Sequence, residues 1–257
     1  MKLIRKGKIT NAVIFIVSFL AIICIWELIA RNSNPILFPN ISGICKGLKN
    51  TVFSMDTYQH LSASFLLISI AFLLSIIIAF PTALLCFRHR LFSKVVLPYH
   101  NFIRYIPVPA LVPFCAVFFG VEDTTKIVLV FIGTYFQMLF LFINDFENVP
   151  KGYIESAETL GFKKVNLITQ ILIRAAAPDI LNTIRITFAW AWSYLLVAEV
   201  INSIKGIGYL VLQSYRVLNM PRLIAYLFII GIFGIFMDRL FRYIRILLCP
   251  HIKKGKK

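Results

Sequence analysis

The sequence has 257 residues, of which 59% are hydrophobic and only 15% are charged, and its mean hydropathy is +0.83. A soluble domain is closer to half apolar and lacks repeated apolar runs of about 20 residues, so these values exclude that class and indicate an integral membrane protein. The net charge of +16 does not indicate nucleic-acid binding, because the Lys and Arg residues flank the apolar runs instead of forming one basic domain.

Neither the cysteines nor the histidines form a pattern typical of a metal or redox site. The cysteines are scattered and contain no CxxC pair, and the histidines show no HExxH or similar spacing. The sequence therefore predicts no disulfide framework, no bound metal and no cofactor of the chain's own. The residues concerned are Cys24, Cys45, Cys86, Cys115 and Cys249, and His60, His89, His100 and His251.

The apolar runs predict an all-α chain that crosses the membrane about six times, since about 20 helical residues span the ~30 Å hydrocarbon core. The first run is too long for the apolar part of a secretory signal peptide and no small-residue cleavage pattern follows it, so a retained helix is expected. The polar connection after the first run includes a short segment, residues 41–52, that is a candidate for lying on the membrane surface. The predicted spans are residues 11–30, 61–87, 107–120, 124–146, 179–203 and 221–248.

The third predicted span is irregular, because Pro98, Pro107, Pro109 and Pro113 interrupt it. A proline in a helix interior removes a backbone hydrogen bond and disfavours helical geometry in the residue before it. One interpretation is a broken or bent entry followed by a helix over 107–120. The other is a short interfacial helix followed by an ordinary span with a proline at its start. The sequence does not decide between them.

The distribution of Lys and Arg predicts the topology. With a cytosolic N-terminus and six spans, the inner side carries 19 of these residues and the outer side seven, with Arg104 assigned to neither. The positive-inside rule therefore places both termini in the cytosol, together with the polar segment formed by residues 148–178.

This polar segment lies between two apolar blocks and is expected to form two short amphipathic helices. Tyr153, Ile154, Ala157 and Leu160 fall on one face of the first helix. Gly161 is expected to end that helix, because glycine adopts a positive φ without steric cost. A second apolar stripe is expected after it, with Lys163 and Lys164 on the opposite side; its members are Phe162, Val165, Ile168 and Thr169. This periodicity alone also fits a plain interfacial helix.

The polar segment resembles the EAA loop of ABC-transporter permeases. Glu155, Ser156 and Ala157 take the E-A-A positions, Gly161 stands four residues after Ala157, and an apolar stretch ends near Pro178. Flanking stretches resemble the nitrate/sulfonate/taurine subgroup: IPVPALVPFCAVFFG upstream, and AWAWSYLLVAEV and KGIGYLV downstream. The resemblance extends from about residue 61 to the C-terminus.

Two residues depart from the family's pattern. Ser156 replaces the middle alanine, and Arg174 stands where these permeases usually carry the proline that begins the fifth helix. The amphipathic helix could therefore continue further here, or Arg174 could extend its guanidinium to the lipid headgroups.

The resemblance implies a type I ABC importer permease, a multi-pass protein of the bacterial cell membrane. Residues 1–60 would form an N-terminal tail, a first helix and an outer loop, and residues 61–257 the permease core. Expected partners are a second permease copy, a cytosolic ATPase dimer, an extracytoplasmic solute-binding protein and membrane lipid. ATP would be bound by the ATPase, since this sequence contains no G-x-x-x-x-G-K-[ST] motif. The resemblance assigns ATPase coupling to Glu155, Ser156, Ala157, Leu160, Gly161 and Phe162.

Polar residues within the spans are candidates for the solute path or its gate, because burying them in lipid is costly. Glu199 falls near the outer end of the fifth span, and Trp192 lies seven residues earlier on the same helix face. The alternative is an interfacial Glu199 paired with Lys205 or Arg216. Weaker candidates are Thr187, Ser193, Gln137 and Asn144. The residues assigned to the path or gate are Glu199, Trp192, Tyr194, Pro107 and Pro113.

Two other functional classes are alternatives to an importer of a small, polar, anionic solute. A self-contained secondary transporter or channel would be expected to show midplane charge pairs and an inverted repeat, and neither is evident in the sequence. A membrane enzyme would be expected to show a nucleophile elbow, a carboxylate pair or a His/Cys/Asp cluster, and none stands out.

Overall fold

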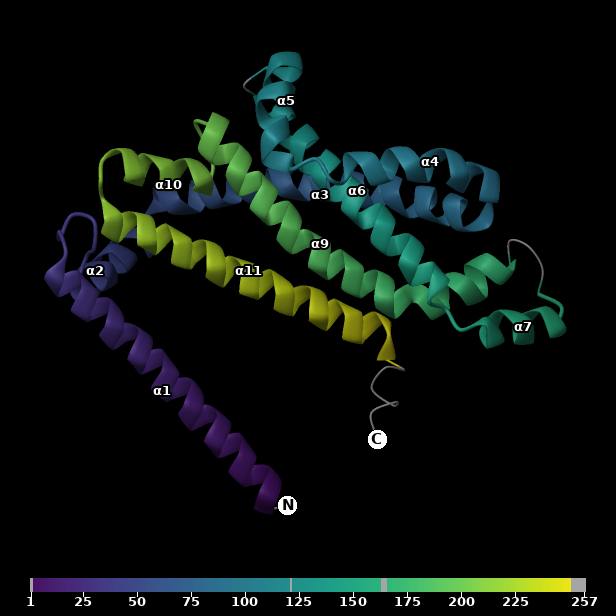
Figure 1. The fold of residues 1–257 in the computed structure, drawn as a ribbon, viewed down its shortest axis with the longest axis horizontal. Coiled ribbons are helices and arrows are strands. Elements are labelled where there is room, and N and C mark those ends of the chain that lie inside the picture. Colours follow the sequence, from purple (N-terminus) through teal and green to yellow (C-terminus); the bar gives the residue numbers. More distant parts are fainter. Residues whose placement is uncertain (1, 121, 163–165, 251–257) are drawn as a thin grey trace. The chain divides into compact units, whose positions relative to one another are not determined.

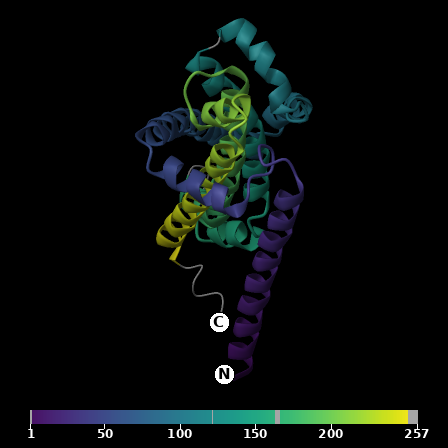
Figure 2. The same ribbon diagram turned by 90° about the vertical axis from the view of Figure 1, so that its left-hand side faces the viewer.

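A computed structural model describes residues 2–120, 122–162 and 166–250, without the side chains of residues 2–12 and 202. The described part consists of helices and connecting segments and contains no strand, which confirms the all-α prediction (Figures 1 and 2). Five of its helices are long and apolar enough to cross a membrane, or up to six if one bent pair counts as a span. Lys163, Lys164, Val165 and His251 lie outside the described residues.

The chain divides into two compact units. One comprises Met1–Tyr58 and Leu210–Ile230, and the other comprises Gln59–Tyr209 and Gly231–Lys257. The first unit thus combines the N-terminal residues with a later segment, Leu210–Ile230. The predicted functional division into residues 1–60 and 61–257 stays a prediction.

The first unit contains α1 (Lys2–Asn32) and α2 (Ile41–Val52). Asn40 caps α2 by accepting a hydrogen bond from the Gly43 amide at 2.8 Å. The Glu27 carboxylate of α1 accepts another from the Ile41 amide at 3.1 Å, so α1 also supports the start of α2. The structure shows that the candidate surface segment 41–52 is the helix α2.

The second unit is built around α6 (Asp123–Glu147) and α9 (Ile173–Asn202), which pack side by side (Figure 1). Parts of α3 (Met55–Arg88) and α11 (Met220–Leu248) join them through aromatic contacts. The ring of Phe188 lies 5.3 Å from Phe72 and 5.0 Å from Phe241, measured between centroids, and so links α9 to α3 and α11. Such edge and tilted ring pairs add to the packing energy of buried aromatic residues.

The third predicted span is a bent structure. It consists of α4 (Arg90–Ile103), the 3₁₀ turn η1 (Val108–Ala110) and α5 (Leu111–Phe119), with a bend of 79°. At ~1.5 Å per residue α5 is too short to cross the hydrocarbon core. The structure therefore has the broken arrangement and not an ordinary span with a proline at its start.

The predicted start of the fifth span at residue 179 is wrong. A π-helix, η2 (Leu167–Leu172), leads directly into α9 at Ile173, and Pro178 lies inside α9. Proline removes only one backbone hydrogen bond, which membrane helices tolerate when neighbouring groups compensate. The short helix α10 (Ile207–Arg216), which follows α9, was not predicted.

Candidate coupling and translocation sites

The polar segment contains a helix with a defined glycine stop. Helix α7 (Lys151–Thr159) ends in a Schellman motif, in which the Gly161 amide donates to Glu158 O at 2.9 Å and the Phe162 amide donates to Ala157 O at 3.0 Å. Gly161 has a φ of +87°, which L side chains rarely adopt. The structure thus gives Gly161 the helix-ending conformation expected from the sequence.

The predicted apolar stripe of α7 faces two directions. Ala157 is buried and Ile154 is half-buried, and α7 packs against η2. Tyr153 and Leu160 instead expose 60% and 78% of their surface. Exposed large apolar side chains on a polar segment are typical of a surface that another protein covers.

The remaining residues of the predicted coupling set surround this exposed face. Glu155, Ser156 and Gly161 are exposed, and Phe162 is half-buried. Among the described residues, no atom lies within 4 Å of the position that a Gly161 side chain would occupy, so they leave the turn open. Arg174, the departure from the family pattern, is also exposed.

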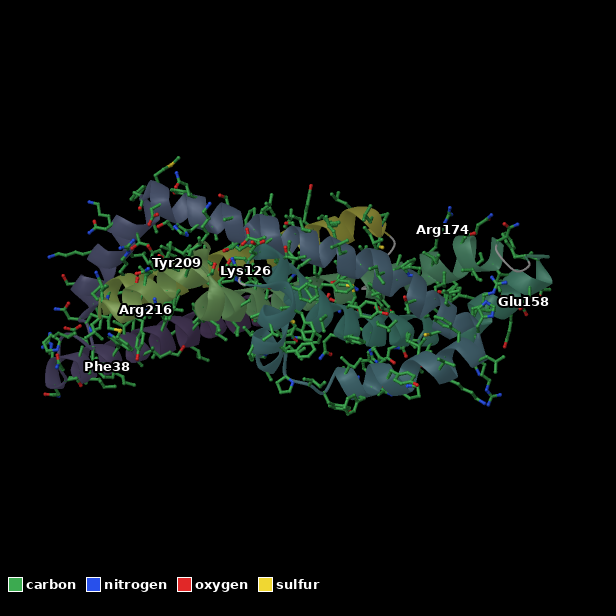
Figure 3. All side chains as sticks on the ribbon, turned by 90° about the horizontal axis from the view of Figure 1, so that it is seen from above. Phe38, Lys126, Glu158, Arg174, Tyr209 and Arg216 are labelled. Carbon is green, nitrogen blue, oxygen red and sulfur yellow. The ribbon has the colours of Figure 1, made fainter. Side chains whose placement is uncertain are left out.

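The second candidate site lies at the other end of α9. Figure 3 shows Glu158 and Arg174 at one end of the second unit, and Lys126 and Tyr209 toward the other. At that other end the Glu199 side chain is fully buried. Its carboxylate accepts hydrogen bonds from Ser64 Oγ at 2.5 Å and from the Gly208 amide at 2.9 Å.

Two further hydrogen bonds hold the connection between α9 and α10 against α3. His60 Nδ1 accepts from the Gly206 amide at 3.0 Å, and Ser64 Oγ accepts from the Ile207 amide at 2.9 Å. His60 and Ser64 are four residues apart and therefore share one face of α3. We call Glu199, Ser64, His60, Gly206 and Gly208 the Glu199 cluster.

The two glycines leave the space that the Glu199 side chain fills. A Cβ atom on Gly206 would overlap the Glu199 carboxyl group, and Gly206 has a φ of +117°. A Cβ atom on Gly208 would lie 2.8 Å from Glu199 Cβ and 2.8 Å from Leu196 O. The predicted alternative partners of Glu199, Lys205 and Arg216, form no ion pair with it in the described part of the chain.

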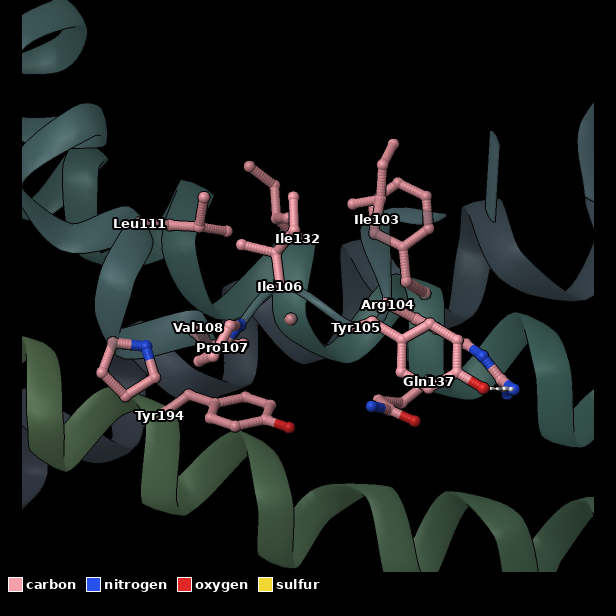
Figure 4. Close-up of a pocket in the computed structure, with 13 residues that line it drawn as sticks. Ile103, Arg104, Tyr105, Ile106, Pro107, Val108, Leu111, Ile132, Gln137 and Tyr194 are labelled. Atoms are coloured by element: carbon pink, nitrogen blue, oxygen red, sulfur yellow. Dashed lines mark hydrogen bonds between the residues drawn. The ribbon is translucent and has the colours of Figure 1, made fainter. Parts of the chain in front are cut away.

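The other predicted path residues do not form one cluster. Trp192 is buried against Phe233, with ring centroids 4.8 Å apart. Tyr194 and Pro107 line a cavity of about 240 Å³ at the break between α4 and η1 (Figure 4). Pro113 is exposed on α5, away from the residues that line this cavity.

The weaker polar candidates are partly accounted for by local hydrogen bonds. Thr187 Oγ1 donates to Thr183 O of its own helix at 2.8 Å, and Ser193 Oγ donates to Ala189 O at 3.1 Å. Such bonds to the preceding turn are the common state of hydroxyl residues in membrane helices. Gln137, in contrast, lines the same cavity as Tyr194.

Sequence reasoning missed His60, Ser64 and Lys126. Lys126 is almost fully buried, and its ammonium contacts Asp123 Oδ1 at 2.7 Å. The i, i+4 spacing of His60 and Ser64 and the Gly-x-Gly spacing of 206 and 208 were visible in the sequence. Only the folded chain shows that they surround one carboxylate.

Solved structures of low sequence identity share this fold. One inward-facing structure of the MetNI methionine ABC transporter matches with a TM-score of 0.65 and 18% identity, covering 72% of this chain and 92% of that chain. A second gives a TM-score of 0.63 and covers 84% and 99%. The fold is therefore that of a type I ABC importer permease, a multi-pass membrane protein.

Relatives in sequence define the family. The family of binding-protein-dependent transport system inner membrane components matches residues 71–245. A Methanocaldococcus jannaschii protein named as an ABC transporter permease is 30% identical, over 86% of this chain and 85% of its own length. The bicarbonate transport system permease of Synechocystis is 25% identical over 96% and 91%, and the Escherichia coli taurine permease is 24% identical over 75% and 70%.

The chain therefore belongs to the family of binding-protein-dependent transport system inner membrane components. It is an ABC importer permease subunit.

Proposed function

We propose that this chain forms the membrane path of an ATP-driven importer and couples to a cytosolic ATPase dimer through α7 and the Gly161 turn. A second copy of the chain would complete the path, and an extracytoplasmic binding protein would deliver the solute. ATP would be bound and hydrolysed by the ATPase subunits alone. Both termini and the polar segment would lie in the cytosol.

The observation that carries the coupling proposal is the exposed face of α7. Tyr153 and Leu160 are apolar and exposed on a segment that is otherwise polar, next to the open Gly161 turn. Ile154 and Ala157 anchor the other face of α7 to the chain. A force applied to the exposed face would therefore pass through η2 into α9, because η2 and α9 are continuous.

The Glu199 cluster would act at the outer end of the path. Its hydrogen bonds fix the α9–α10 connection to α3, so a rearrangement of α9 would pull on that connection. We assign Glu199 a positioning role in the outer gate, with Trp192 on the same helix. Tyr194, Pro107 and Pro113 would belong to the path near the break in the third span.

The proposed solute is a small polar molecule with an anionic group, such as a sulfonate, nitrate or bicarbonate. Two of the relatives are named for taurine, which carries a sulfonate, and for bicarbonate. The excess of Lys and Arg, 27 against 11 Asp and Glu, is compatible with an anion.

Substitution of Gly161 tests the coupling proposal. Gly161→Glu places a charged, β-carbon-bearing residue at a φ of +87°, on the proposed docking surface. We expect the variant to insert into the membrane and to lose co-purification with its ATPase. Gly161→Asn, whose residue tolerates this backbone region, should retain a larger share of the complex.

Gly120→Glu is the matched control. Gly120 also has a positive φ, +76°, and open space around it, and it follows the C-terminal end of α5, the end away from the break in the third span. Gly120→Glu therefore places the same charge at another positive-φ glycine outside the polar segment, and the variant should keep the ATPase. If Gly161→Glu co-purifies with the ATPase as well as Gly120→Glu does, the docking assignment is wrong.

A further inference from the structure

The cavity at the break between α4 and η1, here the Arg104 cavity, carries an arrangement of polar groups that the coupling proposal does not use. It has a volume of about 240 Å³ and is lined by both apolar and polar side chains. Figure 4 shows the Tyr194 hydroxyl directed toward the Gln137 amide, with Tyr105 and the Arg104 guanidinium beyond it. Hydrogen-bond donors of three chemical kinds thus follow one side of a single cavity.

The Arg104 guanidinium is held by stacking. Its central carbon lies 4.1 Å from the centroid of the Phe140 ring and 5.0 Å from that of Tyr105. Stacking on aromatic faces covers the plane of the guanidinium and leaves its N–H donors pointing outward from the edge. One of them, Nη2, donates to the Tyr105 hydroxyl at 3.2 Å, and that hydroxyl can donate its own proton onward.

The positive charge of Arg104 is not neutralised within the described part of the chain. No carboxylate there lies within ion-pair distance of it. Its Nε atom is buried and makes no hydrogen bond. A cation that is partly desolvated and lacks a counter-ion attracts an anion more strongly than a solvated surface arginine does.

The cavity also accounts for the interruption of the helix between Ile103 and Val108. Non-helical backbone at membrane depth is tolerated where it lines a water-filled cavity, and the break between Ile103 and Val108 lines this one. Close packing fixes the opposite wall, because a Cβ atom on Gly133 would lie 2.6 Å from Val108 Cγ2 and 2.9 Å from Tyr194 Cδ2. Gly133 therefore lets the Tyr194 ring approach the break.

We propose that the Arg104 cavity is an anion-binding site, in which Arg104 holds the anionic group of the solute and Gln137 and Tyr194 complete its hydrogen bonds. The inference rests on the proposed function, since the anion would be the transported solute. It adds a site within the permease itself, with a preference for a compact oxyanion such as a sulfonate.

Binding is tested with the full-length chain alone in phosphatidylcholine nanodiscs, without ATPase or binding protein. The probe is trifluoromethanesulfonate, observed by the broadening of its ¹⁹F NMR line. We expect saturable broadening with the wild-type chain that taurine and nitrate compete away. Arg104→Gln should weaken binding about tenfold, as expected for loss of a charge-assisted hydrogen bond, while Arg104→Lys should retain most of it.

Three controls separate the effect of the Arg104 charge on binding from the effect of misfolding. Lys94→Gln removes one cation from the exposed surface of α4, the helix that ends just before Arg104, and should leave the broadening unchanged. Trifluoroacetamide, an uncharged probe, should show no difference between the wild-type chain and Arg104→Gln. Each variant is compared by gel filtration and melting temperature, so that a misfolded Arg104→Gln is recognised; Gln137→Leu, which removes another proposed donor of the site and should also weaken binding, then decides the test.

Equal broadening of the sulfonate probe by wild type and Arg104→Gln would overturn the proposal. Complete loss of binding when phosphatidylglycerol is added to the nanodisc would also overturn it, because the site would then take a lipid phosphate. The NMR test concerns the anion site alone, so a negative result does not decide whether the chain binds an ATPase or supports ATP-driven uptake. Conversely, a chain that fails the ATPase-binding and uptake assays could still bind the sulfonate probe.

Discussion

Glu199 shows how a membrane helix can hold a buried carboxylate that forms no ion pair with any residue the structure describes. Its two oxygens accept hydrogen bonds from Ser64 and from the Gly208 amide, and the missing side chain of Gly206 gives the carboxyl group room. A buried polar group costs little when its hydrogen bonds are complete and a great deal when one is lost. The glycines are therefore as necessary to this site as the acid.

Gly206→Ala tests that dependence. The added methyl group would overlap the Glu199 carboxyl group at a φ of +117°, so we expect a loss of about 2 kcal/mol or more in stability and a lower melting temperature in detergent. Gly234→Ala in α11, where no atom lies within 4 Å of the new side chain, should not lower it. Equal melting temperatures for both variants would show that the Glu199 cluster is not packed as described.

Some residue-level features could be predicted from the sequence and others could not. The conformation of Gly161 follows from local chemistry, since a glycine after an amphipathic helix commonly ends it. The partners of Glu199 do not, because Ser64 is 135 residues away and pairing at that separation depends on the fold. The sequence pointed to Lys205 and Arg216 only because they are near in the chain.

Helix boundaries show the same division between local and tertiary causes. The start of α2 has a local cause, because the Asn40 side chain caps it by accepting a hydrogen bond from the Gly43 amide. The predicted start of the fifth span at residue 179 is wrong, because Pro178 lies inside α9 and the π-helix η2 leads into α9 without a stop. Arg174 in place of the usual proline agrees with this longer helix.

The contact between α6 and α9 includes one polar link, in which Thr183 Oγ1 donates to Asp145 Oδ2 at 2.7 Å. A double-mutant cycle of Asp145→Ala and Thr183→Val should give a coupling energy of about 1 kcal/mol in thermal or denaturant unfolding. Thr187→Val in place of Thr183→Val is the matched control, because Thr187 bonds within its own helix. Its coupling to Asp145 should be near zero, and equal coupling in both cycles would argue against the inter-helix bond.

For the whole molecule, composition and apolar periodicity were sufficient to predict an all-α membrane protein. The number of spans was harder, because α4 and α5 make a bent pair and α5 alone is too short to cross. The four prolines indicated the break but not its geometry. Pro107 and Pro109 lie at the break, but Pro98 lies inside α4 and Pro113 inside α5. Packing of α4 against α6 also bears on the bend of 79°, as in the contact of His100 Nε2 with Phe136 O at 2.5 Å.

The membrane topology is predicted from the distribution of Lys and Arg along the whole chain. A green fluorescent protein fused to the C-terminus should fluoresce in cells, and an alkaline phosphatase fused there should be inactive, because the basic end is expected in the cytosol. Fusion to Gly161-variant chains should give the same result if they insert normally. An active phosphatase at the C-terminus would reverse the orientation and move the polar segment away from any cytosolic ATPase.

The most direct test of the importer assignment is solute uptake by proteoliposomes that contain this chain, its ATPase and its binding protein, with radiolabelled taurine or bicarbonate as candidate solutes. We predict uptake that requires ATP and stops when the ATPase carries a substitution that prevents hydrolysis. Uptake that continues at the same rate with the inactive ATPase would contradict the account and identify the chain as a self-contained transporter or channel.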